Sequence, residues 1–198
     1  MKIALLVIDA QKVYTDSRSE LFCEGADRTL RQINRLISAF VKRRLPIIFV
    51  RHVHKDDASD LGRMFDFAGD FEDFNFKSGS EEVKYDPRLR FPKRALEIIK
   101  NRYSAFAGTK LNDSLKKLGV KRVVVCGFMT NFCCDSTARE AHDKDYYVDF
   151  IVDATGTPGL DSMDQKHIRR AVAEMLAAGY ACVYSADEFL RKFGRHKS

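Results

Sequence analysis

The sequence predicts an α/β fold: a three-layer αβα sandwich in which one six-stranded, mainly parallel sheet lies between two layers of helices. The first observation is a set of six short apolar runs, typical of strands buried on both faces: residues 3–9, 46–52, 96–100, 122–128, 146–154 and 180–186. The second is that helical segments separate most of these runs, as in βαβ units. The third is the length of 198 residues, which fits a single domain over residues 1–198.

Four segments between these runs are predicted to be helices. The segment 27–43 carries its apolar side chains on one stripe, at the spacing of an amphipathic helix. Gly119 and Gly179 each follow a predicted helix, and glycine is common directly after a helix because it adopts the left-handed conformation easily. The other three predicted helices span residues 110–118, 133–143 and 162–178.

Composition limits the compartment and the partners. The five cysteines are odd in number and form no CxxC motif, so we expect free thiols in a reducing compartment, the cytoplasm. The apolar run in MKIALLVID is shorter than the apolar region of a signal peptide and is better explained as a strand. No run approaches the ~20 apolar residues that cross a bilayer, so we expect no membrane partner.

The net charge of +6 is arranged as a patchwork. Residues 55–86 carry ten acidic and four basic side chains, whereas residues 87–122 carry eleven basic and two acidic ones. Nucleic-acid binding would favour one basic stripe with interleaved aromatic residues, so we expect no nucleic-acid partner. The two blocks are instead expected to face solvent or to meet across the fold or an oligomer interface.

An irregular aromatic and acidic insert at about 55–95 interrupts the alternation of strands and helices. A long segment without a clean period is usually functional or part of an interface in a compact domain. We expect it to form a lid, a subunit contact or a wrap around the domain's own core, and the sequence leaves these three open. Its aromatic residues are Phe65, Phe67, Phe71, Phe74, Phe76, Tyr85 and Phe91.

Reactive side chains follow several of the predicted strands. Asp9 ends the first, Lys100 ends the third, and Cys133 comes shortly after the fourth. Ligands bind outside the carboxyl ends of strands in an open parallel sheet, so these three groups are candidates for one site. Cys133 also begins a predicted helix, and the positive end of a helix together with Lys100 is expected to lower the thiol pKa. The turn 127–133 could supply backbone N–H donors to an oxyanion.

Structural explanations of the same residues stay open at this point. Asp9 could cap a turn, Lys100 could be solvated, and Cys133 could be a small core residue.

Three blocks of the sequence resemble the isochorismatase-like cysteine hydrolase family, which includes nicotinamidases, N-carbamoylsarcosine amidohydrolases and ureidoacrylate hydrolases. LLVIDAQKVY resembles the D-x-Q-x-x-F/Y pattern on the first strand of the family. IIKNRYSAFAGTKL resembles its K-x-R-Y-[SD]-A-F-x-G-T-x-L stretch, and GFMTNFCCDSTAREA resembles its G-x-x-T-x-x-C-V-x-x-T-A-R-x-A signature. The blocks occur in the family's order and the similarity covers nearly the whole chain.

The resemblance implies a fold, a mechanism and a set of residues. Asp9, Lys100 and Cys133 would be the catalytic triad. The family's non-proline cis peptide would join Phe128 and Met129, and the amides of Met129 and Cys133 would form the oxyanion hole. The fold would be an αβα sandwich with a six-stranded parallel sheet, and family members are commonly homo-oligomers, so we expect a dimer or a tetramer.

The sequence departs from the family pattern at two places. Cys134 replaces the usual valine and is expected to face the core. The nicotinamidases of the family bind a metal through Asp-x-His and a later His, whereas this chain has His52-Val53-His54 and no histidine in 55–141. We therefore expect no resident metal or other cofactor, and zinc held by His52 and His54 is the alternative.

The position of five residues makes them candidates for the walls of a substrate pocket, although each could be an ordinary core residue: Tyr14, His52, His54, Phe106 and Phe132. The expected function is a cysteine-dependent hydrolase that cleaves an amide, carbamoyl or ureido C–N bond of a small molecule through a thioester. The alternatives are vinyl-ether hydrolysis of the isochorismate type and a noncatalytic small-molecule-binding or assembly module.

Overall fold

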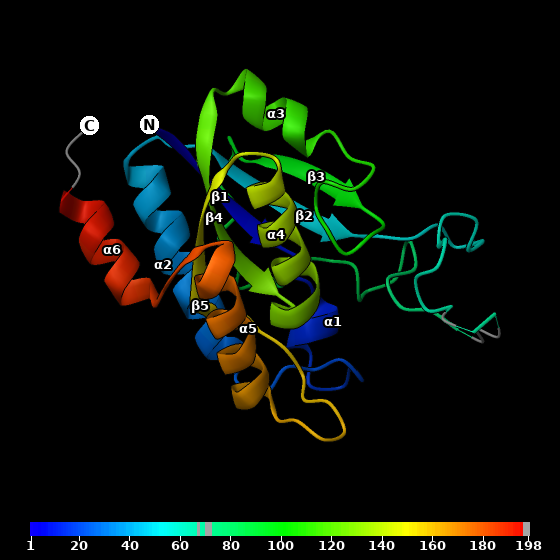
Figure 1. Cartoon of the computed structure of the whole chain (residues 1–198). Helices are drawn as coiled ribbons and strands as arrows, with labels where there is room; N and C mark the ends of the chain where they lie inside the picture. The colour runs from blue at the N-terminus through cyan, green and yellow to red at the C-terminus, as the bar shows by residue number, and fades with distance from the viewer. Residues whose placement is uncertain (67, 70–72, 196–198) are drawn as a thin grey trace.

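The computed structural model describes residues 1–66, 68–69 and 73–195. Its centre is one six-stranded sheet in the order β3-β2-β1-β4-β5-β6, and every neighbouring pair is parallel. Figure 1 shows the twisted sheet with helices packed on both sides, so the predicted αβα sandwich is confirmed. The strands are β1 Lys2–Ile8, β2 Ile47–His52, β3 Leu96–Lys100, β4 Val120–Phe128, β5 Tyr147–Gly156 and β6 Cys182–Tyr184.

The central strands bring three parts of the chain to one carboxyl edge. β1 lies between β2 and β4, and Ile8 pairs with both Val50 and Gly127. One strand further out, His52 at the end of β2 pairs with Lys100 at the end of β3. The side chains that follow these strands therefore share one edge of the sheet, which is where ligands bind in open parallel sheets.

Two separate hydrophobic cores fix the helices to the sheet. The first lies under α2 (Ala26–Lys42) and α6 (Ala186–Arg195). The second lies under α3 (Leu111–Lys117), α4 (Asp135–Asp143) and α5 (Gln165–Gly179). Side chains of β1 enter the two cores alternately: Leu5 and Val7 enter the first, whereas Leu6 and Ile8 enter the second. Among the described residues, no helix combines the length and the apolar character needed to pass through a bilayer.

Several boundaries differ from the prediction for local reasons. Gly179 is the last residue of α5, and Tyr180 takes the C-cap position. The strand expected over 180–186 is limited to β6, because Ser185 begins a capping box: the Glu188 amide donates to Ser185 Oγ, and the Ser185 amide donates to the Glu188 carboxylate. This cap starts α6, which was not predicted. The four-residue helix α1 (Lys12–Thr15) is too short to show a period.

The insert at about 55–95 partly wraps the domain's own core. Its later part is tied to the sheet, because Phe76, Val83 and Leu89 are buried in the first core. Isolated bridges also pair Gln11 with Tyr85 and His54 with Lys77. Figure 1 shows the chain after β2 extending to one side of the sheet before it returns to β3. Phe67 and Phe71, two of the aromatic residues noted above, lie outside the described residues.

Gly127 on β4 lies directly against the backbone of Ile8 on β1, and its replacement should be costly. A Cβ atom at this position would lie 1.9 Å from the carbonyl oxygen of Ile8, and the residue has a φ of 127°. We expect Gly127→Ala to lower the free energy of unfolding by about 2–4 kcal/mol, measured by urea denaturation. The matched control is Gly179→Ala, since a Cβ there meets no atom within 4 Å. Equal stability of the two variants would contradict this account of the β1–β4 contact.

Candidate active site

The carboxyl edge of the sheet brings together the three reactive side chains that the sequence singled out. Lys100 Nζ lies 2.7 Å from Asp9 Oδ2 and 3.3 Å from Cys133 Sγ. Asp9 is 0% exposed, and Lys100 and Cys133 are each 2% exposed. A carboxylate, an ammonium and a thiol therefore form one buried cluster built from three distant parts of the chain.

The ammonium of Lys100 lies at the centre of this cluster. Its third neighbour is the carbonyl oxygen of Arg102, which accepts a hydrogen bond of 3.0 Å. An ammonium has three N–H donors, so each can face one partner: the carboxylate, the sulfur and this carbonyl. The contact with Asp9 is a buried ion pair that engages Oδ2 of the carboxylate. The carboxylate therefore keeps lone pairs available for a proton.

The local backbone aims Asp9 and Cys133 at the same place. Asp9 follows β1 in the left-handed region with a φ of 44°, and its amide donates to the Val50 carbonyl on β2. Cys133 lies in η1 (Thr130–Cys134), a π-helical turn that leads directly into α4. Side-chain hydrogen bonds attach this turn to the end of β5. They run from Thr130 to Thr155 at 2.9 Å and from Thr157 to Asn131 at 2.7 Å.

The expectation of an acidic thiol at Cys133 is wrong for this structure. Burial raises the pKa of Cys133 to about 12, Lys100 opposes this rise, and the nearby Asp9 charge adds to it. The loss of water around the sulfur outweighs the attraction of a single ammonium. Burial also raises the pKa of Asp9, with Lys100 acting in the opposite direction. The resting site therefore holds a protonated thiol beside a carboxylate with increased basicity.

The non-proline cis peptide bond that the family resemblance implies is present in the turn after β4. The peptide bond between Phe128 and Met129 is cis. The Met129 carbonyl oxygen accepts hydrogen bonds from the amides of Phe132 and Cys134. An oxyanion hole formed by the amides of Met129 and Cys133 stays a prediction.

The aromatic residues expected around the pocket separate into two groups. Tyr14 is buried and stacks on Phe128 with ring centroids 5.5 Å apart, and Phe132 packs against Tyr103 at 5.2 Å. Phe106 instead stacks on Tyr146, 6.0 Å away, just before β5 begins. That contact lies at the amino ends of the strands, so Phe106 is better explained as a core residue than as a pocket wall.

The two histidines form a buried pair next to the cluster. His52 Nε2 lies 2.9 Å from His54 Nε2, and both residues are at most 1% exposed. Gln11 holds the His52 backbone from both sides: it accepts from the His52 amide at 2.7 Å and donates to the His52 carbonyl at 3.0 Å. On the far side, His54 Nδ1 faces the Asp60 carboxylate at 3.3 Å.

The described residues do not fit a metal at the histidine pair. Within the described ranges, the one group of three candidate ligands comprises Asp9, His52 and Cys133, and it does not include His54. Lys100 places a positive charge against two members of that group, which disfavours a dication there. The two Nε2 atoms face each other at hydrogen-bond distance, and the Asp60 carboxylate lies at the other ring nitrogen of His54, Nδ1, so the three side chains do not converge on one point.

Sequence reasoning missed residues that support the site from outside the triad: Gln11, Asp60, Phe76 and Tyr103. The glutamine belongs to the DAQ block, so its motif was a signal for it. Asp60 and Phe76 lie in the insert, where a missing period gives no position in space. Phe76 stacks on His52 with centroids 4.3 Å apart. The insert therefore supplies part of the site's wall.

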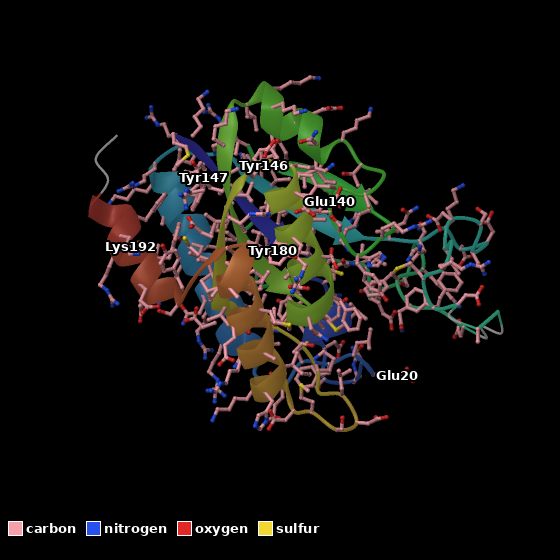
Figure 2. The ribbon with its side chains drawn as sticks, viewed as in Figure 1. Glu20, Glu140, Tyr146, Tyr147, Tyr180 and Lys192 are labelled. Atoms are coloured by element: carbon pink, nitrogen blue, oxygen red, sulfur yellow. The ribbon has the colours of Figure 1, made fainter. Side chains whose placement is uncertain are left out.

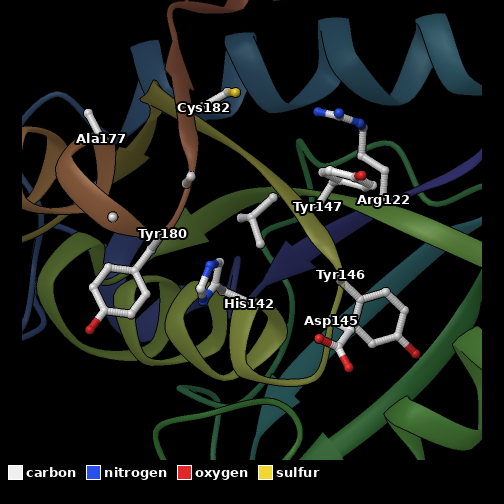
Figure 3. A pocket seen from close by; sticks show the side chains of 11 residues that line it. Arg122, His142, Asp145, Tyr146, Tyr147, Ala177, Tyr180 and Cys182 are labelled. Atoms are coloured by element: carbon white, nitrogen blue, oxygen red, sulfur yellow. The ribbon is translucent and has the colours of Figure 1, made fainter.

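A surface groove of about 620 Å³ lies away from this cluster (Figure 3), and three of the residues that line it, Tyr146, Tyr147 and Tyr180, are labelled in Figure 2. Figure 3 shows Tyr180 and His142 on one side of it and Tyr147 beside Arg122 on the other. It opens between α4, α5 and the amino ends of β5 and β6, whereas the triad lies at the carboxyl ends. The groove therefore does not belong to the candidate active site.

Comparison with known proteins gives one family over almost the whole chain. The isochorismatase domain matches residues 3–186. Nicotinamidase 3 of Arabidopsis thaliana is 32% identical over 189 residues, which cover 95% of this chain and 87% of that protein. The ureidoacrylate amidohydrolase RutB of Variovorax paradoxus is 24% identical over 212 residues, which cover 96% of this chain and 81% of that protein.

A solved structure shares the fold. The crystal structure of a cysteine hydrolase from Pseudomonas syringae pv. phaseolicola has a TM-score of 0.90 to this chain at 24% sequence identity. The match covers 98% of this chain and 92% of that chain. At this identity, the likeness establishes the fold.

The buried thiol gives a testable pH dependence for alkylation. Because its pKa lies near 12, the alkylation rate of Cys133 by iodoacetamide should rise about tenfold per pH unit between pH 7 and 9 without a plateau. Lys100 lowers the thiol pKa, so Lys100→Met should slow the reaction at a given pH by about tenfold or more. Peptide-resolved mass spectrometry measures the rate, with exposed Cys182 as the internal reference.

The control for this experiment is Lys117→Met, which removes an exposed lysine on α3. A plateau below pH 7, or the same profile in Lys100→Met and the parent chain, would contradict the assigned role of the ammonium.

Proposed function

Because the chain belongs to the isochorismatase family, we propose that it is a cysteine hydrolase that cleaves the C–N bond of a small amide, carbamoyl or ureido compound. The observation that carries this proposal is the position of the Lys100 ammonium, 2.7 Å from the Asp9 carboxylate and 3.3 Å from the Cys133 sulfur. A nucleophile, a base and a cation gathered in one cluster are the side chains that acyl transfer through a thioester requires.

The first half of the reaction forms a thioester. The Cys133 sulfur attacks the carbonyl carbon while Asp9 takes the thiol proton, so the thiolate forms only as the bond to carbon is made. The charge passes to the carbonyl oxygen, which backbone amides at the start of the helical turn can stabilise. The C–N bond then breaks, and Asp9 returns its proton to the leaving nitrogen as ammonia or an amine departs.

The second half regenerates the enzyme. Asp9 takes a proton from a water molecule, which attacks the thioester carbonyl, and the C–S bond breaks as the carboxylic or carbamic acid leaves. The proton on Asp9 then returns to sulfur and restores the thiol. Lys100 keeps its charge throughout, and it stabilises the carboxylate and the transient negative charge on sulfur.

The raised pKa values favour this sequence of proton transfers. A carboxylate whose pKa is raised by burial is a stronger base than an exposed aspartate. A pKa closer to the working pH also lets the same group hold the proton and return it to the leaving nitrogen. The protonated thiol at rest means that the proton moves during attack. Names of relatives support the reaction class, since Nicotinamidase 3 and the ureidoacrylate amidohydrolase are both C–N hydrolases by name.

Vinyl-ether hydrolysis of the isochorismate type is the second candidate, since the family bears that name. It needs protonation of a carbon–carbon double bond and no nucleophilic sulfur. The buried contact between Lys100 and Cys133 favours the amide reaction. A noncatalytic binding module would not need to bury an ammonium, a carboxylate and a thiol together, because this costs desolvation free energy.

The proposal predicts a covalent intermediate on one cysteine. Cys133→Ala should fold but lose at least about 10³-fold in kcat for ammonia release from an amide and ureido panel, because no thioester forms. Rapid quenching of the parent enzyme should give an acyl mass adduct on the peptide that contains Cys133.

The matched control is Cys134→Ala, which removes the neighbouring buried thiol in the second core. It should retain turnover despite some loss of stability. Full activity in Cys133→Ala would refute the mechanism, and turnover of isochorismate by that variant would favour the vinyl-ether reaction.

A further inference from the structure

The histidine pair carries one polar atom that the mechanism above does not use. Nδ1 of His52 is buried and has no hydrogen-bond partner among the residues that the structure describes. A ring nitrogen of His52 lies within 4.8 Å of both the Asp9 carboxylate and the Cys133 sulfur. Nε2 is turned to His54, so Nδ1 is the nitrogen left for a bound molecule. A buried polar atom without a partner is costly, and it marks a place that a ligand can satisfy.

Asp60 fixes which ring nitrogens carry protons. Burial opposes the charge on Asp60, but hydrogen bonds from Asn101 and the Lys55 amide lower its pKa overall, so its carboxylate is an acceptor. His54 must therefore present Nδ1–H to Asp60. Burial lowers the pKa of both histidines, so each ring is neutral and has one N–H.

The protonation of His52 follows from this constraint. A neutral His54 with its proton on Nδ1 has a bare Nε2, which accepts a hydrogen bond. The 2.9 Å contact between the two Nε2 atoms then requires the proton to lie on His52 Nε2. His52 Nδ1 is consequently a lone-pair acceptor on a ring that has one nitrogen within 4.8 Å of the Asp9 and Cys133 ligand atoms.

We propose that the chain Asp60–His54–His52 presents His52 Nδ1 as a fixed hydrogen-bond acceptor for an N–H of the substrate on the acyl side of the scissile carbonyl. This proposal rests on the proposed C–N hydrolase function and names its substrate class. A carbamoyl or ureido compound carries an N–H on that side, whereas the corresponding ring of nicotinamide offers an acceptor nitrogen. His52 is then a specificity-determining residue, and His54 and Asp60 are positioning residues.

The surroundings of His52 hold the ring in this orientation. Its face stacks on Phe76 with centroids 4.3 Å apart and an interplanar angle of 10°. Gln11 binds its backbone amide and carbonyl, and the same Gln11 side-chain amide donates to the Val83 carbonyl in the insert. Substrate specificity at this position therefore depends on packing by the insert as well as on the strand that carries the histidine.

The first test reads the proton positions without any turnover. Long-range ¹H–¹⁵N correlation spectra of the full chain with ¹⁵N-labelled histidine should show a protonated Nε2 and a bare Nδ1 for His52, and the opposite tautomer for His54. Asp60→Ala should convert this fixed pair into a mixture of tautomers. A protonated His52 Nδ1 in the parent chain would overturn the proposal. The proposal would also be overturned if the chain, incubated with zinc and passed through gel filtration, retained one equivalent of the metal.

The second test reads selectivity with 3-ureidopropionate and its analogue methylated on the acyl-side nitrogen. The parent enzyme should favour the N–H compound by about 10–100-fold in kcat/KM, because the methyl group leaves the buried acceptor unpaired. His52→Phe keeps a ring against Phe76 but removes both nitrogens, and it should reduce this preference to a few-fold. His142→Phe, on α4, is the matched control and should keep the parent preference.

The two tests separate this inference from the proposed function. Loss of the covalent adduct on Cys133 would refute the hydrolase mechanism and leave the tautomer result intact. Equal kcat/KM for the two ureido compounds, or turnover of neither, would refute the substrate assignment even if the adduct forms with other amides.

Discussion

One buried ammonium holds the candidate active site together. Lys100 pairs with the Asp9 carboxylate and approaches the Cys133 sulfur. All three side chains are buried and almost completely shielded from bulk water. Removing Lys100 or Asp9 would leave the other charge unpaired in the interior, which costs several kcal/mol. The parallel order of the sheet makes this arrangement possible, because β1, β3 and β4, which lead to Asp9, Lys100 and Cys133, all end at one edge.

Burial decides the chemistry of this cluster more than proximity does. The sequence placed a cation and a helical turn beside the sulfur, which suggested a thiolate. The structure reverses that expectation, because desolvation raises the pKa of Cys133 to about 12 despite Lys100. A site of this kind carries the proton on sulfur until a carbonyl is in place, so that Asp9 acts on the thiol only during the reaction.

Local sequence signals were sufficient where strands and motifs carry them. The six strands and the positions of Asp9, Lys100 and Cys133 follow from apolar runs and from what stands at their ends. The same signals could not place Asp60 or Phe76 near the site, because the insert has no hydrophobic period from which a position in the fold can be derived. Phe106 shows the opposite error: it belongs to a family motif block, yet its ring packs at the other end of the sheet. The burial of the Cys133 sulfur also could not be predicted from the sequence, because it depends on every element that packs around it.

The protonated state of the buried Cys133 sulfur affects how readily the enzyme is inactivated by oxidants. Peroxides attack thiolates far faster than thiols, and the products beyond sulfenic acid are not reversed by ordinary reductants. A nucleophile that is both covered and protonated at rest should resist this damage between turnovers. The exposed Cys182 on β6 would meet oxidants first, at the opposite edge of the sheet from the reacting groups. The same desolvation that slows the sulfur as a nucleophile therefore protects it as a thiol.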